Sequence, residues 1–333
     1  MSQGTIGIPA KAGGITSLSG VVLVRPGGTS SNPDKDIMDS IRDIKRRIKS
    51  IKNIQQITRA MEMVAANRLK KAEARALAAR PYTQNITSVL NHVTKSTPEK
   101  AHLFNPKDEV KKIMVILITS DKGLCGAYNT NIIQHTLKFI RENSGKELKL
   151  HLLGKKGNNF FKNRPYTIEQ YYTDTVEQLG ISSLQTSDNK ITEITAKIIN
   201  DLEDGVFDEA HLFFTKFKTM MKSVPTGFRL LPIENVDADS EEKESMMGGY
   251  ILEPSSEVIF SNLLPRYIES QVRQAIFESL TSEFAARRVA MIAASENAEE
   301  IIGELTQTYN RARQEAITKE LLEVVSGSEA LAK

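Results

Sequence analysis

The segment ITRAMEMVAANRLKKAEARALAARP, Ile57–Pro81, decides the fold of this 333-residue chain. Its alanines and long charged side chains favour a helix, and the proline at its end is the only strong helix breaker. The segment contains no His, Cys or Ser that could act as a nucleophile, and its only carboxylates are Glu62 and Glu73. A long basic helix without a reactive group is expected to contact a partner, not to perform chemistry.

Apolar residues extend this helix towards the N-terminus at spacings of three and four. The series is Ile37, Ile41, Ile44, Ile48, Ile51, Ile54, Ile57, Met61 and Val64. This pattern predicts a coiled-coil seam with extra three-residue steps, which locally overwind the supercoil. Pro81 would kink or interrupt the helix, although the sequence after it is again compatible with one. We therefore expect an N-terminal coiled-coil helix over 36–95.

The C-terminal third of the chain repeats this spacing. Its seam positions are Met291, Ala294, Ala298, Ile301, Leu305, Tyr309, Ala312 and Ala316. Small seam residues let two backbones approach closely, so the helix expected over 263–326 is predicted to wind around the first one. Pro265 can occupy the first turn of this helix. A dimeric coiled coil and an ordinary helix bundle remain open as alternatives at this point.

The middle of the chain has a different pattern of apolar residues. The apolar run KKIMVILITS, Lys111–Ser120, is typical of a strand buried on both faces. A helix over 127–141, a strand over 147–154, a helix over 192–205 and a strand over 209–218 are expected to follow. This alternation predicts an open, Rossmann-like α/β domain over 108–260, inserted between the two long helices.

Charge and composition narrow the function classes. The 44 Lys and Arg nearly balance the 41 Asp and Glu, but 36–80 holds twelve basic residues against five acidic ones. Such a helix suits an acidic partner, a phosphate backbone or a lipid surface.

Cys125 is the only cysteine, so no internal disulfide can form. No apolar run approaches the ~20 residues that span a bilayer. Residues 1–35 are rich in Gly and Ser and are expected to form a disordered or processed extension.

The candidate chemical sites are weak. SDKGLCGAYN, Ser120–Asn129, stands where a phosphate loop would stand, but it matches neither G-x-x-x-x-G-K-[ST] nor G-x-G-x-x-G. A tight strand-to-helix turn with a buried structural Cys125 is the better interpretation. The five histidines show no spacing typical of a metal site. The sequence therefore predicts no catalytic residue, no cofactor and no metal.

Three separate segments resemble the gamma subunits of F-type ATP synthases. They are AMEMVAA (60–66), ITSDKGLCGAYN (118–129) and YNRARQEAIT (309–318). They occur in the family's order and at about its spacing, and the likeness extends over roughly residues 36–327. A generic coiled coil would not repeat the first and last of these motifs at opposite ends.

This resemblance implies a rotating central shaft. In the family, two antiparallel helices occupy the axis of a ring of three alpha and three beta subunits. The α/β foot domain sits with the epsilon subunit on the membrane-embedded c-ring. Proton or sodium flow through the c-ring turns the shaft and drives ATP synthesis at the beta subunits, so the chain itself would be non-catalytic. No nucleic-acid partner and no direct membrane insertion are implied.

The resemblance also assigns partner contacts, residue by residue. Met61 matches the position that faces an acidic loop of the beta subunit. Arg287 in AARRVAM, Gln314 in RARQEA and Thr318 in AIT match contacts with a catch loop of beta. Tyr250, before ILEP, matches the region of the foot that touches the c-ring and epsilon.

The implied location is the periphery of a membrane. The cytoplasmic face of a bacterial inner membrane is expected, with an organellar inner membrane or a thylakoid membrane as the alternatives. The chain lacks the paired cysteines of the redox-regulated chloroplast form, which argues against thiol control.

Two functions of other classes remain as alternatives. The run KRRIKSIK would suit a nucleic-acid-binding coiled-coil regulator, whose affinity would fall steeply with salt. An α/β enzyme that uses SDKGLCG would instead show activity in the isolated domain.

Overall fold

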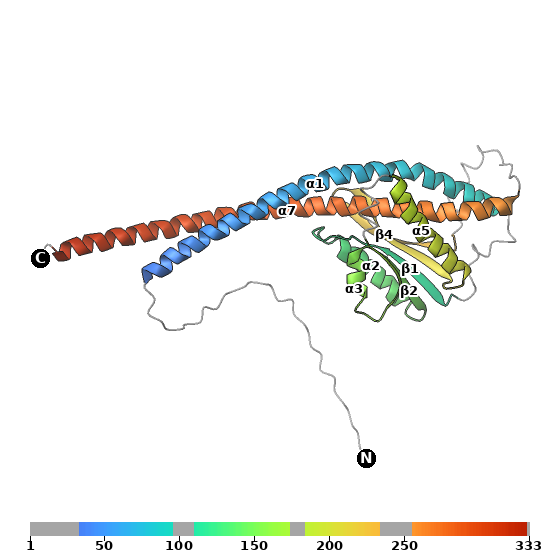
Figure 1. The fold of residues 1–333 in the computed structure, drawn as a ribbon, viewed down its shortest axis with the longest axis horizontal. Coiled ribbons are helices and arrows are strands. Elements are labelled where there is room, and N and C mark those ends of the chain that lie inside the picture. Colours follow the sequence, from blue (N-terminus) through green and yellow to red (C-terminus); the bar gives the residue numbers. More distant parts are fainter. Residues whose placement is uncertain (1–32, 96–109, 174–183, 234–254, 332–333) are drawn as a thin grey trace, which may run out of the picture. The chain divides into compact units, whose positions relative to one another are not determined.

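The computed structural model describes residues 33–95, 110–173, 184–233 and 255–331 of the chain (Figure 1). Its elements, in chain order, are α1 (Pro33–Lys95), β1 (Lys112–Ile118), α2 (Tyr128–Glu142), β2 (Glu147–Leu153), α3 (Lys155–Phe161), β3 (Thr167–Tyr172), α5 (Leu184–Glu203), β4 (Glu209–Thr219), β5 (Lys222–Leu231) and α7 (Ser256–Leu331). This order confirms the predicted class, with an α/β domain inserted between two terminal helices. The chain divides into a large unit, 46–307, and a small unit that combines 1–45 with 308–333.

The sheet of the large unit has five strands in the order β3-β2-β1-β4-β5. The first four strands in this order are parallel, and β5 pairs antiparallel with β4. The three expected strands are its centre, whereas both edge strands were missed. Edge strands carry weaker signals: β3 has the polar sequence TIEQYY, and β5 contains Pro225 and Gly227, which disfavour a central strand.

The alternation of side chains along β1 places helices on both faces of the sheet. Ile113, Val115 and Leu117 pack against α2 and α3 in one apolar cluster. Met114, Ile116 and Ile118 belong to the cluster on the other face, which also contains residues of α5, α1 and α7 (Figure 1). A strand covered on both faces is therefore apolar at every position, as the unbroken run predicted.

The central part of α7 is buried on all sides. Every residue from Ala275 to Ala285 is buried, although AIFESLTSEFA contains two glutamates, two serines and a threonine. A helix that is enclosed all round has no polar face to pattern its sequence. Its polar side chains must instead find partners, because an unpaired polar group in the interior is costly.

Glu278 binds several partners from this buried stretch. Its Oε1 accepts hydrogen bonds from Nη2 of Arg80, at 2.7 Å, and from Nε2 of Gln274, at 3.0 Å. Its Oε2 accepts the backbone N–H of Phe217, at 3.0 Å. The single carboxylate therefore links α7 to α1 and to β4.

Two serines of α7 continue this contact with the same strand. The backbone N–H of Thr215 donates to Oγ of Ser279, at 3.2 Å, and Oγ of Ser282 donates to the carbonyl of Thr215, at 3.1 Å. Side chains of α7 thus bind backbone groups of β4 that the sheet leaves available.

Within the large unit, α1 and α7 are antiparallel, as predicted. Oγ1 of Thr58 lies 2.6 Å from Oγ of Ser295, whereas Thr83, further along α1, contacts the carbonyl of Ser270, further back along α7. Gln55 also reaches Glu299, at 3.4 Å. The seam between the helices is consequently polar at this point.

The predicted seam is wrong over 54–64. Ile54, Ile57 and Val64 are 51%, 58% and 51% exposed, whereas Thr58 and Ala65 are buried. A heptad seam averages 3.5 residues per step, so three successive three-residue steps from Ile48 carry the apolar series away from the seam. The contact continues through smaller and polar residues, and an apolar stripe is left on the surface.

The two prolines lie inside the long helices. Helix α1 runs through Pro81 to Lys95, so it is not interrupted there and continues to the residue expected from the sequence, with Ala76, Thr83 and Ile86 buried on either side of the proline. Helix α7 begins at Ser256, so Pro265 lies inside it and not in its first turn. Among the residues that the structure describes, no helix has a stretch long and apolar enough to cross a membrane.

Replacing Glu278 should destabilise the fold markedly. The substitution Glu278→Ala leaves the N–H of Phe217 and part of Arg80 without an acceptor, so the free energy of unfolding should fall by about 2–4 kcal/mol. The exposed Glu299 is the matched control on the same helix, and Glu299→Ala should cost no more than about 0.5 kcal/mol. Urea unfolding measures both values, and equal costs would contradict the assigned role.

His151 is a second buried polar residue, on the α5 face of β2. Its Nε2 lies 3.6 Å from Oδ2 of Asp201, whose other oxygen accepts a hydrogen bond from Nζ of Lys197, at 2.6 Å. Burial lowers the pKa of His151 from 6.5 to about 4, and Asp201 and Glu169 oppose this shift only in part. The imidazole is therefore neutral in the folded chain at neutral pH.

This burial predicts a loss of stability in mild acid. Between pH 6.5 and 4 the unfolded chain binds a proton at His151 that the folded chain excludes, so stability falls as the pH falls. The loss between pH 7 and 5 should be about 2 kcal/mol. His151→Asn removes the titration, and its urea-unfolding free energy should lack this increment. An identical pH dependence in both proteins would refute the assignment.

Candidate functional site

A groove of about 580 Å³ lies between α1, α7 and the loop that follows β1. It belongs entirely to the large unit, and it brings together residues that are distant in the sequence. Its lining includes Ile57, Met61, Val64 and Arg68 of α1, Lys122, Gly123 and Leu124 of the loop, and Glu283, Phe284 and Arg287 of α7.

The loop lies at the position in the sheet where proteins of this fold class commonly bind ligands. In the order β3-β2-β1-β4-β5, the connections from β1 and β3 lead to opposite sides of β1, so the carboxyl ends of β1 and β4 form a switch point. Open α/β sheets usually bind ligands there, through a glycine-rich phosphate loop. Here the loop over 119–127 lacks that fingerprint and is fastened to α7.

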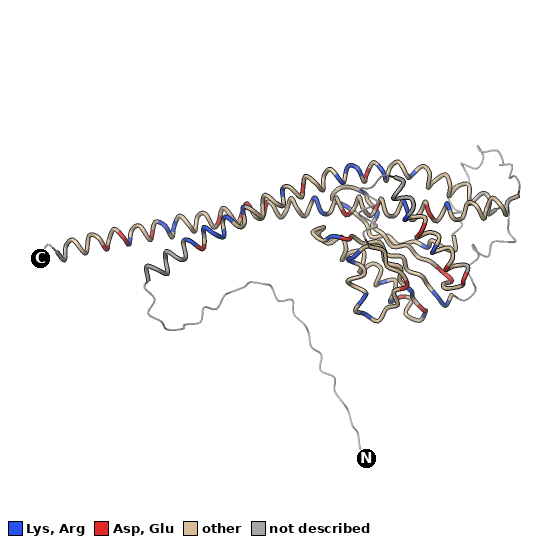
Figure 2. The backbone as a smooth tube through the Cα atoms, in the orientation of Figure 1, with Lys and Arg blue, Asp and Glu red and all other residues tan. Residues whose placement is uncertain are grey.

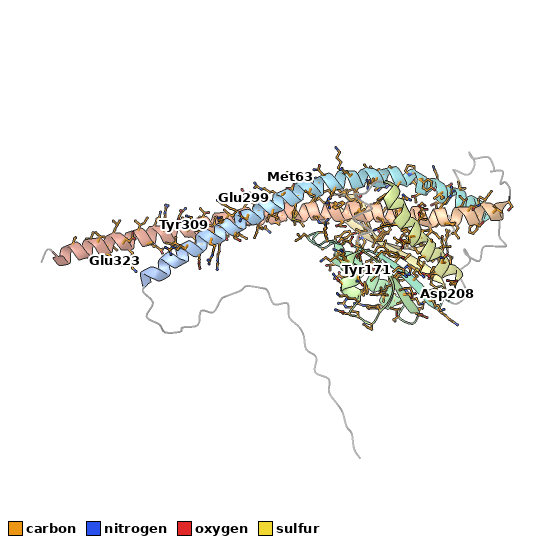
Figure 3. All side chains as sticks on the ribbon, in the orientation of Figure 1. Met63, Tyr171, Asp208, Glu299, Tyr309 and Glu323 are labelled. Carbon is orange, nitrogen blue, oxygen red and sulfur yellow. The ribbon has the colours of Figure 1, made fainter. Side chains whose placement is uncertain are left out.

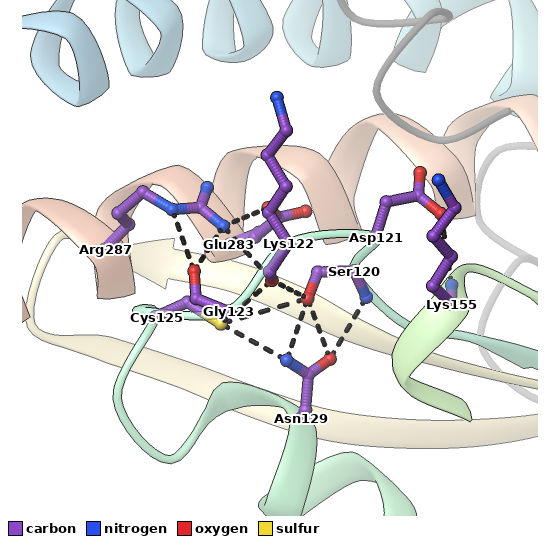
Figure 4. A network of polar contacts seen from close by, with 9 residues as sticks. All are labelled: Ser120, Asp121, Lys122, Gly123, Cys125, Asn129, Lys155, Glu283 and Arg287. Atoms are coloured by element: carbon purple, nitrogen blue, oxygen red, sulfur yellow. Dashed lines mark hydrogen bonds and ion pairs between the residues drawn. The ribbon is translucent and has the colours of Figure 1, made fainter. Parts of the chain in front are cut away.

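Hydrogen bonds from side chains hold the loop in its conformation (Figure 4). The backbone N–H of Ser120 donates to Oδ1 of Asn129, at 3.0 Å, and Nδ2 of Asn129 donates to Oγ of Ser120, at 2.8 Å. The same Nδ2 reaches Sγ of Cys125, at 3.2 Å. Oδ1 of Asp121 accepts the N–H of Lys155, which ties the loop to the start of α3. The predicted tight turn is confirmed.

Arg287 fastens the loop from outside. Its Nη2 lies 2.6 Å from Oε1 of Glu283 and also donates to the carbonyl of Gly123, at 3.1 Å (Figure 4). Longer contacts of 3.4 Å join Nη2 to the carbonyl of Lys122 and Nε to that of Gly123. Because both charged side chains are buried, the pair keeps its charges by bonding within the chain.

Leu124 has an unusual conformation at the tip of this loop. Its φ of 62° lies in the left-handed region, which costs a non-glycine residue about 1–2 kcal/mol. Its side chain is nevertheless 62% exposed and lines the groove. Strained residues persist where the surroundings determine them, and they concentrate at functional positions.

Cys125, next to Leu124, is buried, as predicted. Burial raises the pKa of its thiol, and the carboxylate of Glu283 raises it further, while Arg287 acts in the opposite direction. The reactive thiolate is therefore suppressed at neutral pH.

The exposed surface of α1 is apolar and basic. Met63, labelled on α1 in Figure 3, is 63% exposed, close in sequence to the exposed Val64. Towards the N-terminus of the helix, Arg46, Arg47, Lys49 and Lys52 are exposed, and Figure 2 shows Lys and Arg recurring along α1. An apolar stripe on a basic helix is suited to an acidic partner with some apolar side chains.

The structure brings two of the predicted contact residues together. Met61 and Arg287 both line the groove, Met61 half-buried and Arg287 buried. Gln314 and Thr318 are exposed on α7 in the small unit, where Oγ1 of Thr318 donates to the carbonyl of Gln314, at 2.9 Å. Tyr250 lies outside the described residues.

Of the groove lining, the sequence analysis assigned only Met61 and Arg287 to a site, and it missed the two exposed residues of the loop. Lys122 and Leu124 were treated as part of a turn, because neither belongs to an apolar or charged pattern. The leucine between Gly123 and Cys125 in KGLCG was the available signal, since an apolar residue inside a glycine-containing turn is unusual.

In the small unit, the end of α7 carries a second apolar surface. Leu321, Leu322, Val324 and Val325 are all more than half exposed. Exposed apolar residues that gather on one segment mark a binding surface more often than a free one.

The fold defines a class of protein: an α/β domain inserted between two long terminal helices that pack against each other and against the sheet. The family model described as ATP synthase matches residues 40–331. The chain is 40% identical to the ATP synthase gamma chain of Heliobacterium modesticaldum over 299 residues, which cover 88% of this chain and all of that one. It is also 40% identical to the gamma chain of Moorella thermoacetica, with the same coverage.

Solved structures agree in fold. A chain of the Euglena gracilis mitochondrial ATP synthase, determined with its OSCP, F1 and c-ring, matches with a TM-score of 0.59 at 18% identity and covers 88% of this chain and 95% of that chain. A chain of the Tetrahymena thermophila central stalk and c-ring matches with a TM-score of 0.54 at 24% identity and covers 72% of this chain and 99% of that chain. The chain therefore belongs to the family of ATP synthase gamma chains.

The closed loop predicts that the thiol of Cys125 is alkylated slowly. Cys125 in the folded chain should react with a neutral alkylating reagent at pH 8 at least about tenfold more slowly than in urea, because burial hinders access and raises its pKa. Mass spectrometry of timed samples measures both rates. Equal rates would mean that the loop does not enclose the thiol.

Proposed function

We propose that the chain is the central rotating shaft of an F-type ATP synthase. In this role it couples proton or sodium flow through the c-ring to ATP synthesis or hydrolysis at the beta subunits, and it is not itself catalytic. The observation that carries the proposal is the match to gamma chains along nearly the whole chain, including 40% identity over a complete relative.

The chemistry of the groove supports a non-catalytic role. Its charged pair, Glu283 and Arg287, is bound within the chain, and Cys125 beside it is a buried thiol of raised pKa. The side chains offered to a partner are Met61, Leu124 and the exposed apolar stripe, which can bind but cannot transfer a group.

Such surfaces are sufficient for a shaft. A rotor needs to stabilise one conformation of each beta subunit at each angle, so its contacts select among states that the ring already populates. Small apolar contacts and basic side chains can make that selection without deep interlocking, which would oppose rotation. Electrostatic attraction to acidic loops adds orientation.

The partner contacts follow from this role. Met61 would face an acidic loop of beta, while Arg287, Gln314 and Thr318 would act where the ring's catch loop reaches the shaft. The exposed leucines and valines at the end of α7 would lie in the bearing of the ring. The complex would contain three alpha and three beta subunits for each copy of this chain.

The α/β domain over 108–260 would form the foot, with epsilon and the c-ring as its neighbours. Tyr250 would contribute to that contact. The complex would sit at the cytoplasmic face of a bacterial inner membrane, with this chain at the periphery and not inserted. The extension expected over 1–35 lies outside the described residues as far as residue 32, and α1 already begins at Pro33.

Assembly with its ring tests the proposal. The chain should be co-expressed with alpha and beta chains of the same organism, and native mass spectrometry should find one copy with three of each. Sustained ATP hydrolysis should fall by about tenfold when the chain is omitted, equivalent to ~1.4 kcal/mol of barrier. Gln314→Ala with Thr318→Ala should lower the rate, whereas Glu315→Ala, on the same turns of α7, should not.

A different result would point to the other class of function. A chain that forms only self-dimers, ignores the ring and binds DNA at low salt with an affinity that falls steeply as salt rises would contradict the shaft. It would favour the nucleic-acid-binding regulator.

A further inference from the structure

We infer that Arg287 is a positioning residue, which holds the loop Lys122–Leu124 in the conformation that a ring partner meets. The contact surface is then Lys122 and Leu124 beside Met61, and Arg287 acts through them. The inference rests on the proposed function, because it concerns the contact with the beta subunit.

The burial of Arg287 is the first argument. The side chain of Arg287 is only 10% exposed, and its guanidinium bonds to Glu283 and to the carbonyls of Lys122 and Gly123. The ring of Phe284 lies below it, with its centroid 5.7 Å from the guanidinium carbon. A direct ion pair with a partner would have to break these bonds inside a buried site, which is costly.

The form of the loop is the second argument. Carbonyl oxygens of two successive residues point at one guanidinium, and the next residue, Leu124, takes a φ of 62°. The guanidinium presents its donors in one rigid plane, and this fixed geometry holds both carbonyls and the carboxylate more rigidly than a flexible ammonium would. The clamp thus helps to determine a conformation that a leucine alone would avoid.

The consequence of this conformation is the third argument. Leu124 displays an exposed apolar side chain in the groove that Met61 also lines, and Lys122 is exposed in the same loop. These side chains suit an acidic loop that carries an apolar residue. With Gly123, they are the groove residues on a connection between elements, where a shift of the backbone moves side chains most easily.

Arg287→Lys isolates the clamp, because it keeps the charge and loses the fork. Cys125 reports on the loop directly, since it is the only cysteine and lies next to Leu124. In the free full-length chain, Arg287→Lys should increase the alkylation rate of Cys125 by about tenfold, while the thermal unfolding midpoint changes little. A thiol pKa fitted from the pH profile of alkylation separates altered access from altered acidity.

Arg288→Lys is the matched control on the neighbouring position. Arg288 lies 3.9 Å from Glu62 and 3.4 Å from Sδ of Met220, and no contact between it and the loop is found among the described residues. Its substitution should leave the alkylation of Cys125 at the wild-type rate.

The assembled complex then distinguishes positioning from direct contact. Leu124→Ala, with the clamp intact, should reduce sustained ATP hydrolysis to about the level of Arg287→Lys, and the double variant should be no worse than either. Should Arg287→Lys fail to fold, Glu283→Gln weakens the same clamp with less change in shape and should give the same two results.

Two outcomes would overturn the inference while leaving the shaft intact. One is reduced ATP hydrolysis in Arg287→Lys with unchanged alkylation of Cys125, which would make Arg287 a direct contact. The other is wild-type hydrolysis in Leu124→Ala. If the wild-type chain forms no complex at all, the proposed function fails, and that result is separate because the alkylation experiment needs no ring.

Discussion

The carboxylate of Glu278 is the contact on which the large unit depends. A charge inside a protein is tolerated only where bonds replace its lost hydration. Glu278 obtains these bonds from three elements: Arg80 of α1, Gln274 of α7 and the backbone N–H of Phe217 in β4. The contact between α1 and α7 and the contact between α7 and the sheet therefore stabilise each other. Loss of either contact would weaken the other, because both use the same carboxylate.

The remainder of the buried stretch of α7 extends this arrangement. Ser279 and Ser282 bind the backbone of Thr215, and one turn further along, Arg287 binds the loop after β1. One helix thus binds β4 of the sheet, the first helix and the loop at the switch point. A groove with a defined shape results from this helix and does not need a ligand to form it.

The centre of the fold was readable from the sequence, because its elements have strong periodic signals. The apolar run of β1 and the seam spacing of the terminal helices depend on local pattern alone. The seam over 54–64 was not readable, since the contact uses Thr58 and Ser295, whose hydroxyls satisfy each other only in the folded chain. The burial of every residue over 275–285 was not readable either, because its polar side chains form no apolar pattern.

The candidate site divides in the same way. The residues of the AMEMVAA and AARRVAM motifs came from the resemblance, and the structure places Met61 and Arg287 on one groove. Sequence could not show that Arg287 turns inward, because its acceptors are backbone carbonyls, which carry no residue signature. Leu124 could not be predicted for a related reason. Its importance lies in a φ of 62° and an exposed side chain, and residue type indicates neither of them.

Native-state hydrogen exchange of the full chain in increasing urea tests the central claim, that the buried segment of α7 holds the large unit together. The amides of Thr215 and Phe217, of Val115 in β1 and of 276–284 in α7 should open together, with one free energy equal to that of global unfolding. Opening of the α7 amides at a clearly lower free energy, while Val115 stays protected, would contradict the account. It would show that the sheet is stable without the helix.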